Sequence, residues 1–362
     1  MGVEIKLTDK HFPVSPVFID FLHRYLSNQK YETGWHDQLS EELNRPDDML
    51  NKEQGPAIAS EVMAAPEGQQ AILRSYEMLT AILTGDVKRV EFFRERYQFI
   101  CIVGIPRHGG SYLTKQLFLS LGMNPDEVPN VIAHDGFPDA SPFDFREGYN
   151  SYTTMMQNMA EYFAMIELFF SNSRLYNNRV IVPKKATKSA YHGAFFNAML
   201  GPKTEYVVTL RHPVSACIST YEKSTGLPED GKFKVRGNIE EWVRRDLNYT
   251  TGLTNEEIFD MPYFDAYLHY WEQYHYYVAT TGLSANRNIT LVPYGKERME
   301  AISQSFQNRF ESGAKPNEFK VFDKRDRHPD WIKQAVPVVK RVAEVWDRVG
   351  LKFPYDEVME IW

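Results

Sequence analysis

The chain has 362 residues, of which 43% are apolar, and its formal net charge is -7 at pH 7. This length fits one catalytic domain plus an appendage, and the apolar content is sufficient for a buried core. The acidic balance argues against nucleic acid as a partner, because nucleic-acid-binding modules carry an overall basic excess or a basic stripe.

Cysteine content and hydropathy predict a cytoplasmic protein. Cys101 and Cys217, the two cysteines, lie in apolar runs far apart in the sequence, as expected for reduced thiols in a core. No apolar run approaches the roughly 18 residues that a membrane span needs, and the first residues lack the apolar centre of a signal peptide. No His and Cys cluster has the spacing of metal ligands, so we expect no metal.

Residues 1–95 are expected to form a helical N-terminal extension. Apolar residues recur at helical spacing over 17–26 and 70–83, and a polar, proline-containing stretch around 44–56 separates these two segments. The remaining residues, 96–362, are expected to form the catalytic domain.

The continuous apolar run 99–103, which ends at Gly104, predicts a buried parallel strand. Three further strands are predicted, and helical patterns separate them. These strands cover 179–182, 206–210 and 289–292, and the helices cover 152–170, 190–199, 263–280, 298–310 and 331–349. The alternation predicts an α/β fold, with a central parallel sheet flanked by helices and a P-loop-like nucleotide-binding core. The aromatic-rich segment 267–277 could line an acceptor site, but a helix that packs large side chains is the commoner case.

A glycine-bearing turn follows the first strand, and a helical pattern over 113–121 follows the turn. Such a turn places backbone N–H groups and the positive end of the helix dipole around an anion. The spacing of Gly104, Gly109 and Ser111 matches G-x-x-x-x-G-K-[ST], but Gly110 occupies the lysine position, which argues against an ordinary kinase or NTPase. The cation of the loop is Arg107, and the alternative interpretation is a glycine turn with a surface arginine.

A second candidate segment begins where the strand 206–210 ends in Arg211. Ligands of open α/β sheets bind at the carboxyl ends of the strands, where the arginine offers a planar fork of donors. Pro213 lies near the start of the next helix, and Ser219 could add a hydroxyl from its second turn. The alternative is an ordinary strand-to-helix crossover.

Together the two segments resemble the 5′-phosphosulfate loop and the 3′-phosphate motif of sulfotransferases that use 3′-phosphoadenosine 5′-phosphosulfate (PAPS). Members of that family carry Pro-Lys/Arg-Ser-Gly-Thr-Thr in the loop, so His108 and Gly110 depart from the pattern. The resemblance covers roughly residues 97–355. It implies PAPS as the sulfuryl donor and a hydroxyl group as the acceptor, on a small molecule, a sugar or a carrier-bound acyl chain.

The resemblance also implies roles for individual residues. Arg107 would bridge the 5′-phosphate and the sulfuryl group, Ser111 would donate a hydroxyl, and Tyr112 would lie near the adenine. A basic loop would close over the 3′-phosphate. The expected cofactor contacts are Pro106, Arg107, His108, Gly109, Gly110, Ser111, Tyr112, Arg211, Ser219, Lys324, Arg325 and Arg327.

The expected catalytic residues are Arg107, Lys185 and a general base. Lys185 best fits the family's lysine that precedes the 3′-phosphate strand. Cytosolic relatives have Lys-Thr-His where this chain has Lys-Ala-Thr, so their histidine is absent. Other branches use a carboxylate some two dozen residues after the phosphate loop, so His134 or Asp135 is expected to be the base. His134 is expected in a turn at the carboxyl end of a strand, facing the cofactor cleft. A histidine that is hydrogen-bonded for structural reasons is the alternative.

Two other functions remain open from the sequence. One is a nucleotide kinase or NTPase, against which the missing loop lysine argues. The other is a catalytically silent nucleotide-binding protein, against which the loop arginine argues. A homo-oligomer is compatible with the composition.

Overall fold

The structure is a computed structural model that describes residues 3–7, 10–27, 54–134, 138, 152–224, 231–322, 324 and 327–360. The chain divides into two compact units. The first unit comprises Met1–Gln98, Leu121–Ala140 and Asn150–Lys184. The second unit comprises Phe99–Ser120, Ser141–Tyr149 and Lys185–Trp362.

The first unit opens with a two-stranded antiparallel sheet of β1 (Val3–Leu7) and β2 (Lys10–Val14). The expectation of helix is wrong for these residues. Apolar and charged residues alternate strictly in the sequence of β1, and this period of two is typical of a strand. Helices were correctly predicted over 17–26 and 70–83. The helices in this part are α1 (Pro16–Leu26), α3 (Gln54–Ala64), α4 (Pro66–Thr84) and α5 (Val87–Arg96).

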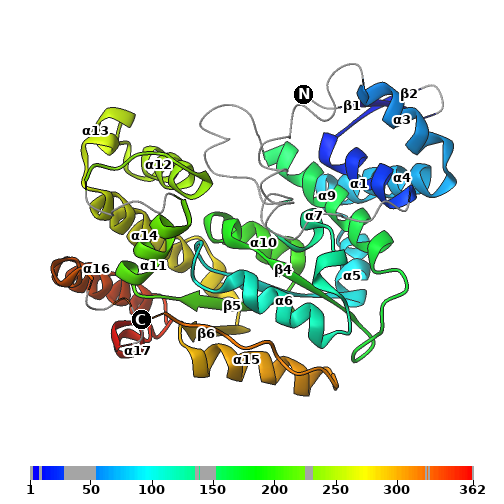
Figure 1. Ribbon diagram of the computed structural model, residues 1–362. Coiled ribbons are helices and arrows are strands. Elements are labelled where there is room, and N and C mark those ends of the chain that lie inside the picture. Colours follow the sequence, from blue (N-terminus) through cyan, green and yellow to red (C-terminus); the bar gives the residue numbers. More distant parts are fainter. Residues whose placement is uncertain are drawn as a thin grey trace. The chain divides into compact units, whose positions relative to one another are not determined.

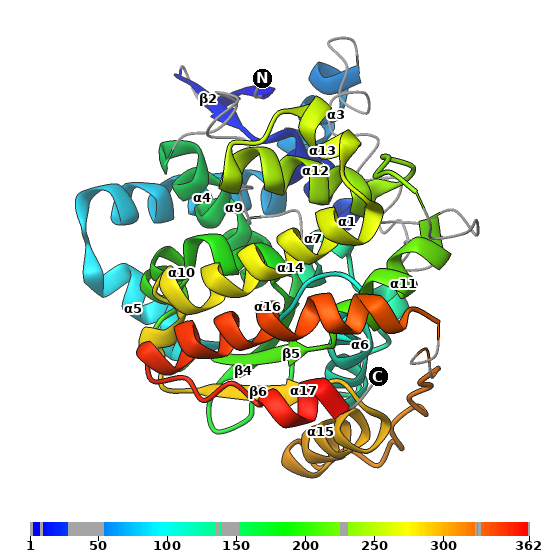
Figure 2. The ribbon, with the colours of Figure 1, turned by 90° about the vertical axis from the view of Figure 1, so that its left-hand side faces the viewer.

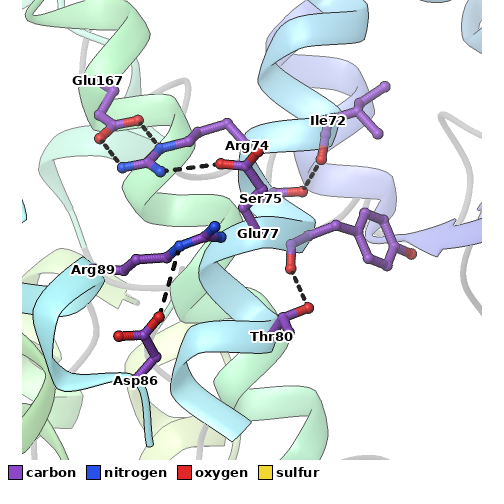
Figure 3. A network of polar contacts seen from close by, with 9 residues as sticks. Ile72, Arg74, Ser75, Glu77, Thr80, Asp86, Arg89 and Glu167 are labelled. Carbon is purple, nitrogen blue, oxygen red and sulfur yellow. Dashed lines mark hydrogen bonds and ion pairs between the residues drawn. The ribbon is translucent and has the colours of Figure 1, made fainter. Parts of the chain in front are cut away.

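Helix α9 (Tyr152–Phe169) packs on α4 and α1 in this unit. Arg74 of α4 donates two hydrogen bonds to the carboxylate of Glu167, from Nε at 2.8 Å and from Nη2 at 2.9 Å, as Figure 3 shows. Glu161 accepts hydrogen bonds from the backbone N–H and the hydroxyl of Ser15, the residue that caps α1. These paired contacts fix α9 against both helices, since a bidentate arginine pair adds directional specificity to packing. A 3-10 turn (Pro125–Glu127) and the short α7 (Asn130–Ala133) also belong to this unit.

A four-stranded parallel sheet in the order β4-β3-β5-β6 lies at the centre of the fold. The strands are β3 (Tyr97–Val103), β4 (Val180–Lys185), β5 (Glu205–Leu210) and β6 (Ile289–Pro293), so all four predicted strands are confirmed. Ile102 pairs with Val207, and Val208 pairs with Leu291. Strands β3, β4 and β5 are buried almost throughout, because their apolar runs are covered on both faces. The predicted α/β fold with a parallel sheet flanked by helices is confirmed.

The helices of the second unit connect and cover these strands (Figures 1 and 2). α14 and α16 run side by side, as Figure 2 shows, and α6 packs against α15. The helices are α6 (Gly110–Ser120), α10 (Gly193–Leu200), α11 (Pro213–Ser224), α12 (Asn238–Thr251), α13 (Asn255–Asp260), α14 (Tyr263–Thr280), α15 (Lys296–Arg309), α16 (Pro329–Arg348) and α17 (Tyr355–Glu360), with 3-10 turns at Thr187–His192 and Leu283–Ala285.

The aromatic side chains of α14 belong to the core. Tyr267, Tyr270, Trp271 and Tyr274 are almost completely buried, which confirms the packing interpretation of the aromatic segment. Two of them also support loops at the end of the sheet: Trp271 Nε1 donates to the carbonyl of Arg211 at 3.1 Å, and the Tyr274 hydroxyl donates to a carbonyl at the start of the 187–192 turn at 2.8 Å. Burial of these rings therefore positions the segments that carry the candidate site.

Candidate anion-binding site

The loop after β3 passes very close to the end of β5. A Cβ atom at Gly104 would lie 2.1 Å from Thr209 Oγ1, so only glycine fits there. The hydroxyl of Thr187 donates to the Gly104 carbonyl at 2.9 Å. The loop thus lies against the end of β5 and the segment that follows β4, at the carboxyl edge of the sheet where α/β folds bind ligands.

Two residues of the loop adopt the left-handed backbone conformation, Arg107 with φ 70° and Gly109 with φ 86°. A Cβ atom at Gly109 would also lie 2.0 Å from the Met299 Cε atom. For a non-glycine residue such as Arg107 this conformation costs about 1–3 kcal/mol, and residues of this kind gather at ligand sites. α6 begins directly afterwards at Gly110, so the positive end of its helix dipole lies at the loop.

Arg107 joins the two candidate segments. Its Nε donates to Ser219 Oγ at 3.0 Å, and its carbonyl accepts from Arg211 Nη1 at 2.8 Å. Arg211 Nε donates in addition to Ser215 Oγ at 2.9 Å. The residues predicted from two separate stretches of sequence are therefore brought into direct contact.

Arg211 is a buried cation, with only 3% of its surface exposed. Its guanidinium lies 4.0 Å from the centre of the Tyr294 ring, and burial lowers its pKa. Within the described part of the chain, no carboxylate forms a hydrogen bond or ion pair with Arg211. Burial of a positive charge is costly unless the charge is paired, so Arg211 is a candidate to bind an anion.

Lys185 extends from the end of β4 to the start of α6. A Cβ atom at Gly110 would lie 3.4 Å from Lys185 Cε and 3.7 Å from its Cδ. The aliphatic stem of a lysine thus covers the position at which an ordinary phosphate loop carries its own lysine, and glycine leaves the room for it. Lys185, at the end of β4, therefore brings a positive charge to Gly110, where the loop itself has no lysine.

Lys223, in the last turn of α11, is a further cation that the sequence analysis missed. Burial and then the charges of Arg107 and Lys185 lower its pKa. One signal in the sequence could have found it: Lys223 follows Ser219 by four residues on one helix, and residues at this spacing share a face.

The basic loop before α16 has a carboxylate partner. Lys324 Nζ binds Glu222 Oε2, and Arg327 Nη1 binds Glu222 Oε1 at 2.5 Å. Although partial burial acts in the opposite direction, these hydrogen bonds hold the pKa of Glu222 below its ordinary value. The expected phosphate contacts Lys324 and Arg327 are thus gathered at α11 through a glutamate, and Arg325 lies outside the described residues.

His108 faces the core of the second unit, although it was expected among the cofactor contacts. It is completely buried, and Nδ1 lies 3.2 Å from the Thr209 carbonyl. Because a carbonyl can only accept, Nδ1 carries the hydrogen. Burial and the nearby ring of His275 lower the pKa of His108 well below its ordinary value. The neutral imidazole therefore anchors the loop to β5.

The remaining predicted loop residues lie around the start of α6. Pro106 and Ser111 are half-buried. The hydroxyl of Tyr112 donates to the Asn317 carbonyl at 2.6 Å, and its ring lies 4.6 Å from that of Phe319. Aromatic surface is therefore present beside the loop.

His134, the expected base, lies in the first unit. It was expected in a turn at the end of a strand, and this is wrong: His134 caps the short helix α7, which starts directly after Pro129. Its side chain is buried, and its carbonyl accepts from Lys184 Nζ at 2.8 Å. The apolar residues before it are buried as one helical turn, a pattern too short to distinguish from a strand. Asp135 lies outside the described residues.

Comparison with known proteins gives one partial similarity. No protein-family model matches the chain, and no curated protein matches it. The chain resembles a solved sulfotransferase structure. That protein, from Alicyclobacillus acidocaldarius, aligns over 71% of this chain and 97% of its own with 14% identity and a TM-score of 0.37.

No helix in the described ranges is long and apolar enough to span a membrane. Nor do these residues include a group of three or more His, Cys, Asp or Glu side chains that could hold a metal ion.

Proposed function

We propose that this protein is a sulfotransferase that moves the sulfuryl group of PAPS to a hydroxyl acceptor. The observation that carries the proposal is the contact of Arg107 with both Ser219 and Arg211. It brings the residues that resemble a 5′-phosphosulfate loop and those that resemble a 3′-phosphate motif within reach of one ligand. Neither segment alone distinguishes PAPS from other nucleotides.

The charges at the site support a ligand with two separate anionic groups. Arg107 and Lys185 lie at the loop and the start of α6, where a 5′-phosphosulfate would bind. Arg211, with Ser219 beside the loop, would take the 3′-phosphate. Because PAPS carries anions at both ends of its ribose, it can neutralise both groups of cations at once. ATP and ADP carry phosphates only on the 5′ side.

The residues of the site would act mainly by position and charge. PAPS supplies an activated sulfuryl group. The acceptor oxygen forms a bond to sulfur, while the bond from sulfur to the 5′-phosphate oxygen breaks and leaves its electron pair on that oxygen. Arg107 and Lys185 would hold positive charge where negative charge develops, which is a large contribution when the groups are fixed before reaction.

The acceptor's proton must pass to a base, and His134 or Asp135 is proposed for this role. A neutral imidazole can accept a hydroxyl proton near neutral pH, which suits His134 to this role. A His134→Ala variant with wild-type turnover and pH dependence would exclude it. The acceptor itself is proposed to be a hydroxyl on a small molecule, a sugar or a carrier-bound acyl chain.

A comparison of nucleotides tests the proposal. We expect 3′-phosphoadenosine 5′-phosphate (PAP) to raise the unfolding temperature markedly more than ADP or ATP at equal concentration, because only PAP offers a 3′-phosphate to Arg211. Equal shifts for all three would refute the assignment, and a larger shift with ATP would favour a kinase or NTPase.

The role of Arg107 gives a kinetic test of the same proposal. Arg107→Ala should lower the turnover of sulfuryl transfer more than it lowers the affinity for PAP, because the charge on the bridging oxygen develops in the transition state. Steady-state rates and PAP titrations on the same preparation measure both quantities. Parallel losses would reduce Arg107 to a binding residue.

A further inference from the structure

Three contacts hold the guanidinium of Arg211 in one orientation. Its Nε donates to Ser215 Oγ at 2.9 Å, and its Nη1 donates to the Arg107 carbonyl at 2.8 Å. One face of the guanidinium lies on the ring of Tyr294, whose centre is 4.0 Å from Cζ. Nη2 has no hydrogen-bond acceptor among the residues that the structure describes. A phosphate can therefore meet this group in the plane of the guanidinium, from the side of Nη2.

The backbone of Tyr294 is fixed beside this arginine. Tyr294 follows β6 directly, and its N–H donates at 2.6 Å to the carbonyl of Leu210, the last residue of β5. This bond extends the parallel pairing of the two strands, in which Leu210 pairs with Pro293. Because Arg211 follows Leu210, the register of the sheet places Tyr294 next to Arg211. The direction of the ring depends in addition on what packs against it.

Phe319 packs against the ring of Tyr294 from the side. The two ring centres are 5.2 Å apart and the ring planes are 71° apart, which is the edge-to-face arrangement that aromatic pairs prefer. Phe319 is itself fixed, because it is 7% exposed and its backbone N–H donates to Glu300 Oε1 of α15 at 3.2 Å. The ring of Tyr294 is thus held between Phe319 and the guanidinium of Arg211.

The segment that carries Phe319 is also bound to α6, the helix that begins at the phosphate loop. The rings of Phe319 and Tyr112 lie 4.6 Å apart, and the Tyr112 hydroxyl donates to the carbonyl of Asn317 at 2.6 Å. The N–H of Asn317 donates to Gln116 Oε1 at 2.9 Å. Because Tyr112 and Gln116 both belong to α6, these contacts connect the phosphate loop with the arginine at the end of β5.

We infer that Tyr294 and Phe319 are positioning residues for the 3′-phosphate of PAPS. The inference rests on the proposed function and extends it to two residues outside the two motifs. The ring of Tyr294 fixes the plane of the Arg211 guanidinium and so the direction of Nη2, and Phe319 acts through Tyr294. A guanidinium that is oriented before the ligand arrives loses less conformational freedom on binding, and this increases the affinity for a phosphate.

Calorimetric titration with three nucleotides tests this role. The ligands are PAP, adenosine 3′-monophosphate and adenosine 5′-monophosphate, and the variants are Tyr294→Leu, Tyr294→Phe and Phe319→Leu. The control is Phe322→Leu, the same substitution at a ring that is 69% exposed and three residues further along the chain. We expect Tyr294→Leu to weaken PAP and the 3′-monophosphate by about 3- to 30-fold, as for loss of a buried cation–π contact. The affinity for the 5′-monophosphate should change less than about 2-fold, because its phosphate binds at the loop.

The other variants separate the ring from the hydroxyl and Phe319 from Tyr294. Tyr294→Phe keeps the ring and should bind all three nucleotides as the wild type does. Phe319→Leu should weaken the 3′-monophosphate by a smaller factor than Tyr294→Leu does. In the double variant this second loss should disappear, because Phe319 acts through Tyr294. Phe319→Leu leaves both Arg211 and Tyr294 in place, so it tests the inference by itself if Tyr294→Leu does not fold.

Four outcomes would contradict these expectations. If Tyr294→Leu and Phe319→Leu bind the 3′-monophosphate as tightly as Phe322→Leu does, the inference is wrong while the proposed function stands. Equal weakening of the 3′- and 5′-monophosphates would also overturn it, since the rings would then support the site as a whole. A loss in Tyr294→Phe as large as that in Tyr294→Leu would mean that the hydroxyl binds the phosphate directly, which is not a positioning role. If the wild-type protein does not bind PAP at all, the proposed function itself fails.

Discussion

Replacing Arg211 with methionine should separate its contribution to folding from its contribution to binding. The side chain is buried, donates hydrogen bonds to Ser215 Oγ and to the Arg107 carbonyl, and lies against the ring of Tyr294. Methionine is similar in length and flexible enough to fill the same space. It removes the charge that would bind a 3′-phosphate.

The expected change in folding stability is small because large terms oppose each other. Two hydrogen bonds from a charged group contribute about 1.5–3 kcal/mol each. The contact with the ring adds about 0.5–2 kcal/mol. Against these, burying a cation costs several kcal/mol. The unfolding free energy of Arg211→Met without nucleotide should therefore stay within about 2 kcal/mol of the wild-type value.

The binding contribution should be lost at the same time. With PAP at about 100 times its Kd, the wild-type protein gains about 2.7 kcal/mol of unfolding free energy, and Arg211→Met should gain almost none. Urea denaturation with and without PAP measures both quantities. Ser215→Ala is the matched control, because it removes one hydrogen-bond partner and keeps the cation.

Two results would refute this reasoning. A loss of more than about 4 kcal/mol without PAP would make Arg211 a structural residue, since breaking a buried charged network costs that much. Full stabilisation of Arg211→Met by PAP would place the 3′-phosphate elsewhere.

The remaining predictions concern pH and the glycines of the loop. Burial raises the pKa of Asp246 to about 7, and its carboxylate accepts from the Tyr191 hydroxyl. The folded state therefore retains a proton that the unfolded state releases, so the contribution of Asp246 to stability should fall as pH rises from about 4 to about 7, by up to about 1.4 kcal/mol per pH unit. Asp246→Asn should flatten this slope in urea denaturation, and an unchanged slope would contradict the assignment. Gly109→Ala should destabilise the protein by about 1–3 kcal/mol, because its φ is 86° and a neighbouring side chain fills the space. Gly110→Ala should fold normally, since Lys185 can move by a few tenths of an ångström, but it should lower turnover. Thermal unfolding and turnover measured on both glycine variants check these two predictions. Equal stability of Gly109→Ala and Gly110→Ala would contradict them.

Local patterns in the sequence identified most elements of the second unit. The continuous apolar run before Gly104 and the alternation of strands with helices predicted the parallel sheet, because burial on both faces excludes polar residues from such strands. For short segments, the local pattern does not distinguish a helix from a strand. Residues 3–7 and 10–14 form strands where helix is expected, although apolar and charged residues alternate in β1, and a turn of helix precedes His134 where the end of a strand is expected. Three apolar residues in a row fit either structure, and tertiary packing decides between them.

The sequence by itself determined the glycine-bearing loop after β3 and the position of Arg211 at a strand end, because glycine spacing, apolar runs and helix starts are properties of neighbouring residues. Only the tertiary structure decided which distant side chains meet. It placed Ser219 against Arg107 and the stem of Lys185 beside Gly110. Strand order and the packing of helices set the distances between these side chains. Residues about a hundred positions apart carry no local signal in the sequence that they lie close together. The same packing turned His108 into the core, where its side chain anchors the loop.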